Sequence, residues 1–415
     1  MTSPVWHPFT QHALMGPVPL VTRGEGAWLE TDTGARILDA ISSWWVITHG
    51  HRHPAIVAAI KAQANRLDQV IFAGFTHEPA EETARRLLDV APPGLAHVFY
   101  SDSGSTAVEV ALKMALGFWR NQGKDRTRII ALEHAYHGDT VAAMSAGARG
   151  VFNAPYEPLL FDVARLPFPA PGRERETLAA LERLAKDAAA LVVEPLLLGA
   201  GGMLIYPAAV LAEMAVICAR HGTLLIADEV MTGFGRTGTL FACEQAGITP
   251  DILCLAKGLT GGSIPLAATL CRAEIFAAHY SKDRRRTFFH SSSFTANPLA
   301  CAAAAANLKL WAEEPVAARV AALGARQAER LARFEGNPQF ANLRQLGTVT
   351  ALDLQVPDPG YLAGLGPELM AFFGVRGLLL RPLGNTIYVM PPYCTTGADL
   401  DLVYDAIAEA GRRFS

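Results

Sequence analysis

Short apolar runs alternate with longer helical stretches between residues 96 and 269, and this alternation constrains the fold more than any other feature of the chain. The expected strands are HVFYS, TRIIAL, ALVVEP, TLLIADEV, DILCLA and AATLC. Helices are expected over residues 104–120, 176–187 and 208–221, which are rich in alanine and leucine. Crossover helices between parallel buried strands produce this pattern. The chain is therefore predicted to be an α/β protein with a mostly parallel central sheet covered on both faces.

A second, smaller α/β domain is expected after Asn297. The alanine-rich stretch PLACAAAAANLKLW suits a long connecting helix, and a helix, a strand, a helix, two strands and a terminal helix are expected beyond it. The first fifty residues show little periodicity apart from a possible short sheet around AWLETDTGARILDA. We therefore expect an N-terminal segment at 1–50 that packs with the small domain, a large domain at 51–305 and a small domain at 306–415.

Composition excludes several classes of partner. The formal net charge is -3 and 18% of the residues are charged, so no charge excess points to nucleic acid. No segment supplies about 20 uninterrupted apolar residues, and the start, MTSPVWHPFTQH, lacks a leader pattern. The six cysteines are spread without a CxxC pair and are expected to be reduced core thiols. These features predict a cytoplasmic protein without a membrane or nucleic-acid partner.

Charged residues follow two of the apolar strands. Asp228 and Glu229 end the apolar run in LLIADEVMTGFGRTG, where a buried carboxylate is costly unless it has a partner. Lys257 follows the apolar run in DILCLAKGLTGG and precedes glycines that let the backbone bend closely around a ligand. In an open α/β sheet both positions face the crevice at the carboxyl ends of the strands. A buried lysine can form a Schiff base with an aldehyde, and a buried aspartate can hold a pyridine nitrogen protonated.

A phosphate cradle completes this set of residues. The segment SDSGSTAVEVALKMA supplies backbone N–H groups at a predicted helix N-terminus, with Gly104 and Ser105 as the expected first contacts. Each feature alone has a plainer explanation: Lys257 as a solvated strand-end charge, Asp228 as an ion-pair partner, and SDSGS as an ordinary helix cap. The three features together, in this order, predict pyridoxal phosphate as the cofactor.

Two further patterns are interpreted as structural. GFGRTG at 233–238 contains GxGxxG, but no clear helix start follows it and the acidic pair precedes it. A tight turn that leaves Arg236 free for a partner contact is therefore favoured over a dinucleotide site. The histidines of ITHGHRHP would share one face of an extended segment, but no nearby carboxylate or cysteine completes a site. No metal is expected.

Five motifs occur in the order found in class III aminotransferases of fold type I, which the chain resembles over nearly its whole length. They are SDSGSTAVEVALKMA, AYHGDT, IADEVMTGFGRTG, LAKGLTGG and SFTANPLACAAA. Within that family, WHPFTQ, SSWWV, HAYHGDT and RPLGNTIYVMPPY resemble the 7,8-diaminopelargonate synthases of biotin biosynthesis. This resemblance implies a fold type I transferase that aminates 8-amino-7-oxononanoate with S-adenosylmethionine as donor. Lysine as the donor, another class III ω-amino acid aminotransferase, and a non-catalytic protein that keeps the fold are the alternatives.

The resemblance also assigns roles to residues. Lys257 would be the Schiff-base lysine, Asp228 the partner of the pyridine nitrogen, and Tyr136 the ring that stacks on the cofactor. The expected cofactor-binding residues are Gly104, Ser105, Tyr136, Asp228, Lys257, Ser292 and Ser293. The two serines would reach the phosphate of the neighbouring subunit in a homodimer. The expected substrate-binding residues are Trp44, Tyr136, Asp139, Ser291 and Arg381. Arg381 would bind the substrate carboxylate, since a guanidinium matches its two oxygens. For Trp44, core packing is the less favoured alternative.

Overall fold

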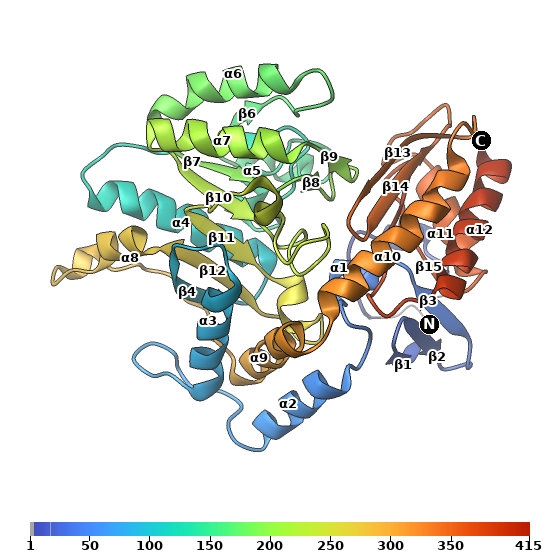
Figure 1. Ribbon diagram of the computed structural model, residues 1–415, viewed down its shortest axis with the longest axis horizontal. Coiled ribbons are helices and arrows are strands. Elements are labelled where there is room, and N and C mark those ends of the chain that lie inside the picture. The colour runs from blue at the N-terminus through green and yellow to red at the C-terminus, as the bar shows by residue number, and fades with distance from the viewer. Residues whose placement is uncertain (1–3, 17) are drawn as a thin grey trace.

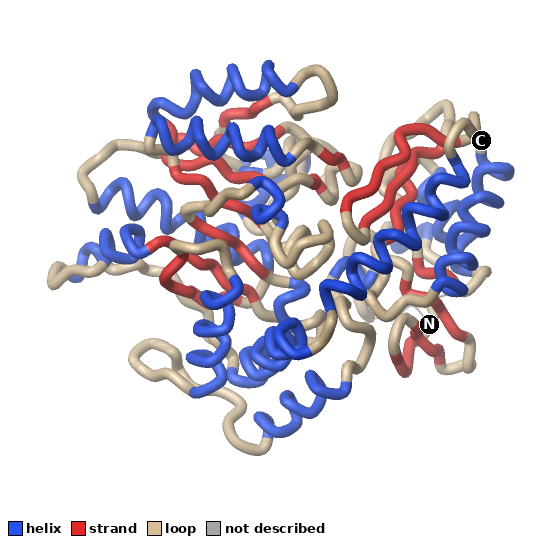
Figure 2. Tube along the Cα trace, viewed as in Figure 1, coloured by secondary structure: helices blue, strands red, loops and turns tan. Residues whose placement is uncertain are grey.

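Figure 1 presents the computed structural model of the chain, in which residues 4–16 and 18–415 are described. Residues 1–3 and 17 belong to the N-terminal segment predicted at 1–50, so part of that prediction lies outside the described residues. A large sheet with its helices fills one side of the view, and smaller sheets with the C-terminal helices fill the other (Figures 1 and 2).

The large sheet has seven strands. They are β4 (Leu95–Ser101), β5 (Arg128–Leu132), β6 (Ala164–Leu166), β7 (Ala188–Val193), β10 (Leu224–Asp228), β11 (Ile252–Leu255) and β12 (Ala267–Arg272). Their spatial order is β4-β12-β11-β10-β7-β5-β6, and only β12 runs antiparallel to its neighbours. The predicted mostly parallel α/β sheet is confirmed. The strand missed by the sequence pattern is β6, because three residues are too few to show a periodicity.

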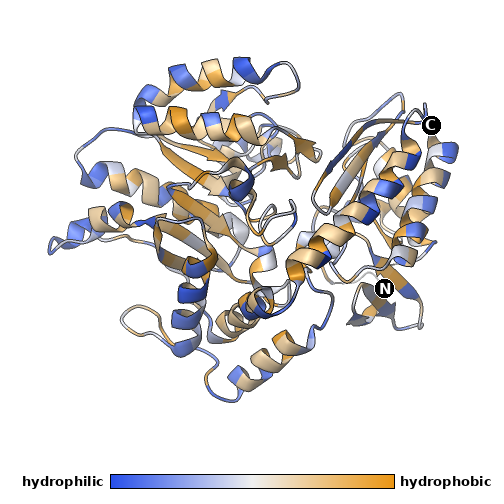
Figure 3. Cartoon of the chain, viewed as in Figure 1, coloured by the Kyte–Doolittle hydropathy of each residue, from blue (hydrophilic) through white to orange (hydrophobic). Residues whose placement is uncertain are grey.

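Helices bury both faces of this sheet. In β10, Leu224 and Ile226 pack into one core, whereas Leu225 and Ala227 pack into cores on the opposite face. Successive side chains of a strand point to opposite faces, so a strand that is apolar throughout must be covered twice. Helices α4 (Gly104–Asn121), α5 (Val141–Ala146) and α8 (Ala273–His279) cover the first face. The second lies under α3 (Glu78–Val90), α6 (Glu174–Leu184), α7 (Ala208–His221) and α9 (Pro298–Glu313). Figure 3 shows the strands as the most hydrophobic elements of this region.

The first fifty residues and the C-terminal part share a sheet. Its strands are β1 (Val21–Glu25), β2 (Trp28–Thr31), β3 (Arg36–Asp39) and β15 (Leu378–Leu379). The parallel pairing of β3 with β15 brings Leu38 opposite Leu378, and both side chains join a core with α10 (Val316–Leu331), α11 (Leu365–Gly374) and α12 (Gly397–Phe414). The predicted division at 305 falls inside α9, so the domain boundaries stay a prediction.

The C-terminal part contains one strand more than the sequence predicts. A three-stranded sheet is formed by β13 (Phe340–Leu346), β14 (Val349–Leu354) and β16 (Thr386–Val389). The prediction of a single strand between α10 and α11 was wrong, because β13 and β14 form a hairpin whose two-residue loop begins at Gly347, with φ of 56°. The remaining elements labelled as α-helices or β-strands are α1 (Ser42–Trp45), α2 (Pro54–Ala64), β8 (Leu197–Leu198) and β9 (Leu204–Ile205), and short 3₁₀ turns lie before and between the elements.

Two expectations about composition can be compared with the structure. Five of the six cysteines are buried and free, as expected, but Cys394 is exposed because it lies in the loop before α12. Over residues 4–16 and 18–415, no helix is long and apolar enough to cross a membrane.

Candidate functional site

Lys257 opens a 3₁₀ turn directly after β11, at the carboxyl end of the strand. Its backbone is left-handed, with φ of 45°, and its Nζ lies 4.6 Å from the centre of the Trp45 ring. Burial of the amine lowers the pKa of Lys257 to about 8, although the nearby carboxylates of Asp228 and Glu194 act in the opposite direction. A neutral amine is therefore available near physiological pH, which nucleophilic attack requires.

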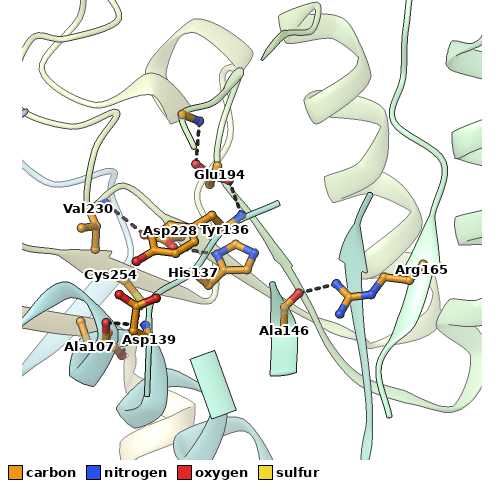
Figure 4. Close-up of polar contacts among 12 residues, drawn as sticks. Ala107, Tyr136, His137, Asp139, Ala146, Arg165, Glu194, Asp228, Val230 and Cys254 are labelled. Atoms are coloured by element: carbon orange, nitrogen blue, oxygen red, sulfur yellow. Dashed lines mark hydrogen bonds and ion pairs between the residues drawn. The ribbon is translucent and has the colours of Figure 1, made fainter. Parts of the chain in front are cut away.

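Asp228 is the last residue of β10 and is buried. Its Oδ2 lies 2.7 Å from His137 Nδ1, and its Oδ1 accepts a hydrogen bond from the Val230 amide at 3.1 Å. Figure 4 shows the His137 ring directed at this carboxylate. These two partners satisfy the buried carboxylate, which would otherwise be costly to bury.

Glu194 is a second buried carboxyl group at the site. It follows β7 and accepts hydrogen bonds from the backbone amides of Tyr136 and Gly199, both at 2.9 Å (Figure 4). Burial raises the pKa of Glu194 to about 7, although nearby His137 and the two amides act in the opposite direction. Glu194 thus links the segment that carries Tyr136 to the loop after β7.

The cradle predicted from SDSGS is the start of α4. Ser103 caps this helix, Gly104 is its first residue, and the Ser105 Oγ accepts a hydrogen bond from the Asp139 amide at 3.1 Å. A Cβ at Gly104 would lie 2.5 Å from Val230 Cγ1, and a Cβ at Gly138 would lie 2.2 Å from Ser105 Oγ. Neither position has room for a side chain, so the backbone around the start of α4 is closely packed. The free N–H groups of the first helical turn favour an anion there.

These residues surround one cavity of about 130 Å³. It is lined by Trp45, Gly104, Ser105, Tyr136, His137, Gly138, Glu194, Asp228, Val230, Met231 and Lys257. The structure therefore brings together the lysine, the aspartate, the tyrosine and the helix start that the sequence predicts. A nucleophilic amine, a supported carboxylate and a helix N-terminus are the donor set that pyridoxal phosphate needs, so the residues fit this cofactor.

A larger cavity of about 350 Å³ adjoins the first and shares Trp45, Tyr136 and Lys257 with it. Its other lining residues are Pro8, Phe9, Trp44, Asp139, Phe152, Ala200, Tyr361, Arg381, Leu383 and Tyr388. The Arg381 Nη2 donates to the Phe9 carbonyl at 3.1 Å, and its guanidinium carbon lies 5.0 Å from the centre of the Trp44 ring. Arg381 forms no ion pair with any carboxylate in the described part of the chain.

The predicted serines of the 291–293 loop line neither cavity of a single chain. Ser291 and Ser293 are exposed, and the Ser291 Oγ donates to the Ser292 carbonyl. The Ser292 amide donates to the Thr295 hydroxyl at 2.9 Å. Their predicted contacts with a neighbouring subunit stay a prediction.

The expectation that Arg236 is free for a partner contact was wrong. Arg236 is buried and donates to the carbonyls of Pro391, Trp45 and Ile47. The turn folds inward because Gly235, at φ of 93°, packs against Trp311 with no room for a side chain. The Arg236 guanidinium therefore binds backbone carbonyls of its own chain and does not face a partner molecule.

The histidines of ITHGHRHP also serve separate contacts. His49 hydrogen-bonds Asn307 at 2.7 Å, whereas His51 lies 2.8 Å from Asp39. Among the residues that the structure describes, no group of three or more histidine, cysteine, aspartate or glutamate side chains could hold a metal.

Sequence reasoning missed His137 and Glu194 as parts of the site. His137 stands beside Tyr136 in AYHGDT, and Glu194 ends a predicted strand, so both carried a positional signal. Phe152 and Tyr361 gave no such signal because they lie in loops. Their rings pack edge to face at 4.6 Å in the wall of the larger cavity.

Comparison with known proteins decides the family. The sequence matches the class III aminotransferase family over residues 11–410. The chain is a class III aminotransferase. Aminotransferases of this class use pyridoxal phosphate, which is therefore the cofactor of this enzyme.

This class III aminotransferase is similar over nearly its whole length to several curated proteins and solved structures. It is 48% identical to the adenosylmethionine-8-amino-7-oxononanoate aminotransferase of Synechococcus elongatus, with 98% of this chain and 97% of the relative covered. A structure of the enzyme of that name from Methanocaldococcus jannaschii matches with a TM-score of 0.95 at 33% identity, covering 99% and 97% of the two chains. An amine transaminase from an uncultivated Pseudomonas species, in its PLP-bound form, matches with a TM-score of 0.93 at 33% identity, covering both chains completely. These matches confirm the predicted fold type I architecture.

Proposed function

We propose that this enzyme transfers an amino group from S-adenosylmethionine to the ketone of 8-amino-7-oxononanoate, giving 7,8-diaminononanoate in biotin biosynthesis. The observation that carries this proposal is the cavity beside Lys257, which has aromatic walls and an arginine without a carboxylate partner in the described part of the chain. The proposed acceptor is an alkyl chain that ends in a carboxylate, and such a ligand matches an apolar cavity with one guanidinium. The names of the relatives support the same choice.

The cofactor would be held by residues of the smaller cavity. Lys257 would bind its aldehyde carbon, Asp228 its ring nitrogen, and Gly104 and Ser105 its phosphate, while Tyr136 would stack on the ring. When bound, pyridoxal phosphate supplies an electron-withdrawing ring that makes a proton on the substrate carbon acidic.

The protein's own groups would then move and hold protons. The Lys257 Nζ would take the proton from the amine-bearing carbon of the donor and pass it to the cofactor carbon that had borne the aldehyde. In the second half-reaction the transfer would run in reverse, and Lys257 would donate the proton to the acceptor carbon that receives the amino group. Its lowered pKa suits this role because the neutral amine accepts the proton near physiological pH. Asp228 would stabilise a protonated ring nitrogen, and His137 holds the Asp228 carboxylate in place through their contact at 2.7 Å.

The substrates would be held by Trp44, Tyr136, Asp139 and Arg381. The Trp44 ring offers a flat apolar surface to an alkyl chain or an adenosyl group, and Arg381 pairs with the carboxylate. Burial and the neighbouring Asp139 carboxylate raise the pKa of Tyr136, so its phenol stays a neutral hydrogen-bond donor. Ser291 would reach the substrate site from the neighbouring subunit, since it lies outside the cavities of its own chain.

We also propose a cytoplasmic homodimer in which Ser292 and Ser293 approach the partner's phosphate site. Both serines stand in a partly exposed loop, which leaves them accessible to a second subunit. Analytical ultracentrifugation at micromolar concentration tests the assembly, and a monomer that is fully active would contradict it. Cell fractionation tests the location.

A half-reaction screen tests the proposed substrates. The purified holoenzyme is mixed with S-adenosylmethionine, lysine, ornithine or 4-aminobutyrate, and formation of the pyridoxamine form of the cofactor is followed by absorbance. We expect a response to S-adenosylmethionine, followed by turnover when 8-amino-7-oxononanoate is added. A response to lysine alone would favour a lysine-using enzyme, and a response only to ornithine or 4-aminobutyrate would refute the proposal. Absence of any response would favour the non-catalytic alternative.

A further inference from the structure

The backbone of residues 42–45, which include two tryptophans that line the larger cavity, adopts an unusual conformation. Ser42, Ser43, Trp44 and Trp45 have φ angles of 55°, 47°, 69° and 74°, so four consecutive residues are left-handed and none is glycine. In this conformation the Cβ of an L-residue crowds the following carbonyl oxygen. Such strain persists only where the surroundings impose it. Neighbouring groups must therefore hold these four residues, labelled α1 in Figure 1, in place. We call them the SSWW turn.

Asp39 is the group that holds the turn from the side of β3. Its Oδ1 accepts the Ser43 amide at 2.8 Å, and its Oδ2 accepts the Ser43 hydroxyl at 2.7 Å. Oδ2 also lies 2.8 Å from His51 Nε2. The Asp39 side chain is completely buried, so both hydrogen bonds to Ser43 are shielded from water.

The SSWW turn places both tryptophans at the cavities. The Trp45 ring lies 4.6 Å from Lys257 Nζ, and the Trp45 Nε1 donates to the Tyr388 hydroxyl at 3.0 Å. Trp44 lies beneath the Arg381 guanidinium. Ser43 directly precedes Trp44, so a change in its backbone would rotate both rings relative to Lys257.

We propose that Asp39, oriented by His51, is a positioning residue that sets the substrate-facing geometry of Trp44 and Trp45. Its two oxygens fix both the amide and the hydroxyl of Ser43. The ends of the turn are held separately, by the Ser42 hydroxyl, which donates to the Met390 carbonyl at 2.8 Å, and by Arg236, which donates to the Trp45 carbonyl. This proposal rests on the proposed function and deepens it, because Trp44 is assigned to the substrates there and Trp45 lines both cavities. Asp39 itself lines neither cavity.

Hydrogen exchange of the holoenzyme without substrate tests the proposal directly. The amides of Trp45, Val46 and Ile47 are hydrogen-bonded to carbonyls at the start of the turn, so they report on its opening. In Asp39→Ala we expect a peptide over residues 40–48 to exchange about tenfold faster or more, because a carboxylate acceptor is lost. KM for the keto acid should rise by a similar factor while kcat changes less.

Two variants provide controls. Asp353→Ala removes another largely buried carboxylate, which pairs with Arg344 at 2.8 Å away from both cavities, and should leave exchange of the 40–48 peptide unchanged. Asp39→Asn keeps an oxygen for the Ser43 amide and should stay close to the unsubstituted enzyme in exchange and KM. If Asp39→Ala does not fold, Ser43→Ala removes only the hydroxyl bond and should show the same change to a smaller degree.

Equal exchange in Asp39→Ala and the unsubstituted enzyme would overturn the proposal, as would equal acceleration in Asp353→Ala. Faster exchange in an enzyme that does not use 8-amino-7-oxononanoate would support the positioning role and refute only the proposed substrate.

Discussion

Arg381 provides the sharpest test of how this enzyme selects its substrate. Arg381→Met removes the guanidinium but keeps an unbranched side chain of similar length, so packing against Trp44 is largely retained. In the structure the Arg381 guanidinium donates one hydrogen bond to the Phe9 carbonyl and forms no ion pair within the described residues. The charge is therefore available to a ligand.

The size of the effect follows from the contact that would be lost. A hydrogen bond to a charged group contributes about 1.5–3 kcal/mol. Since about 1.4 kcal/mol corresponds to a factor of ten, kcat/KM for 8-amino-7-oxononanoate should fall by about 10- to 150-fold. Most of the fall should appear in KM, because the carboxylate lies far from the reacting ketone and binds equally in ground and transition states.

The assay compares the keto acid with its methyl ester in both enzymes. The ester lacks the charge, so Arg381→Met should reduce its kcat/KM only slightly. Arg376→Met is the matched control, because Arg376 pairs with Glu409, packs over Phe372 and lines neither cavity. If the ester lost as much activity as the acid, Arg381 would not be the carboxylate partner.

Three further outcomes concern the cofactor site. Lys257→Ala should abolish the borohydride-dependent attachment of pyridoxal phosphate to the chain, which mass spectrometry of the reduced protein detects; attached cofactor in this variant would exclude Lys257 as the anchor. Because burial lowers the pKa of Lys257 to about 8, capture of added cofactor by the apoprotein should accelerate up to about pH 8 and then level off. Stopped-flow absorbance measures this, and a rate still rising towards pH 10 would argue against a buried amine. Burial raises the pKa of Glu194 to about 7, so the folded protein keeps a proton that the unfolded chain releases, and stability falls as pH rises from about 4.5 to 7. The free energy of unfolding, measured with urea, should therefore fall by about 3 kcal/mol less in Glu194→Gln than in the unsubstituted protein between pH 5 and 8. An unchanged dependence of this free energy on pH would contradict the assignment.

Much of the large sheet could be predicted because its strands are apolar throughout. A strand covered on both faces has no polar positions, so runs such as ALVVEP and TLLIADEV stand out from the chain. The same pattern placed Asp228 and Lys257 at neighbouring strand ends, and parallel strands bring such ends to one edge. The hairpin of β13 and β14 was missed because polar residues interrupt both strands, FANLRQL and VTALDL, and because its loop is only two residues long.

The partners of these residues were decided by tertiary structure. His137 and Glu194 are distant from Asp228 and Lys257 in sequence, and only the packing of β5, β7, β10 and β11 brings them into one cavity. The burial of Arg236 likewise depends on Pro391 and on the backbone of Trp45, which no local pattern links to it.

By itself the sequence therefore determined the fold class, the cofactor and the order of the groups that would bind it. The fold class follows from local hydrophobicity, and the cofactor follows from the chemistry of three motifs taken together in their order along the chain. The tertiary structure alone decided which side chains support those groups, that Arg381 lacks a carboxylate partner among the described residues, and that the SSWW turn is left-handed. Such properties depend on contacts between separate segments of the chain, such as His137 with Asp228, Arg381 with Phe9 and Ser42 with Met390, where burial and hydrogen bonding are set jointly.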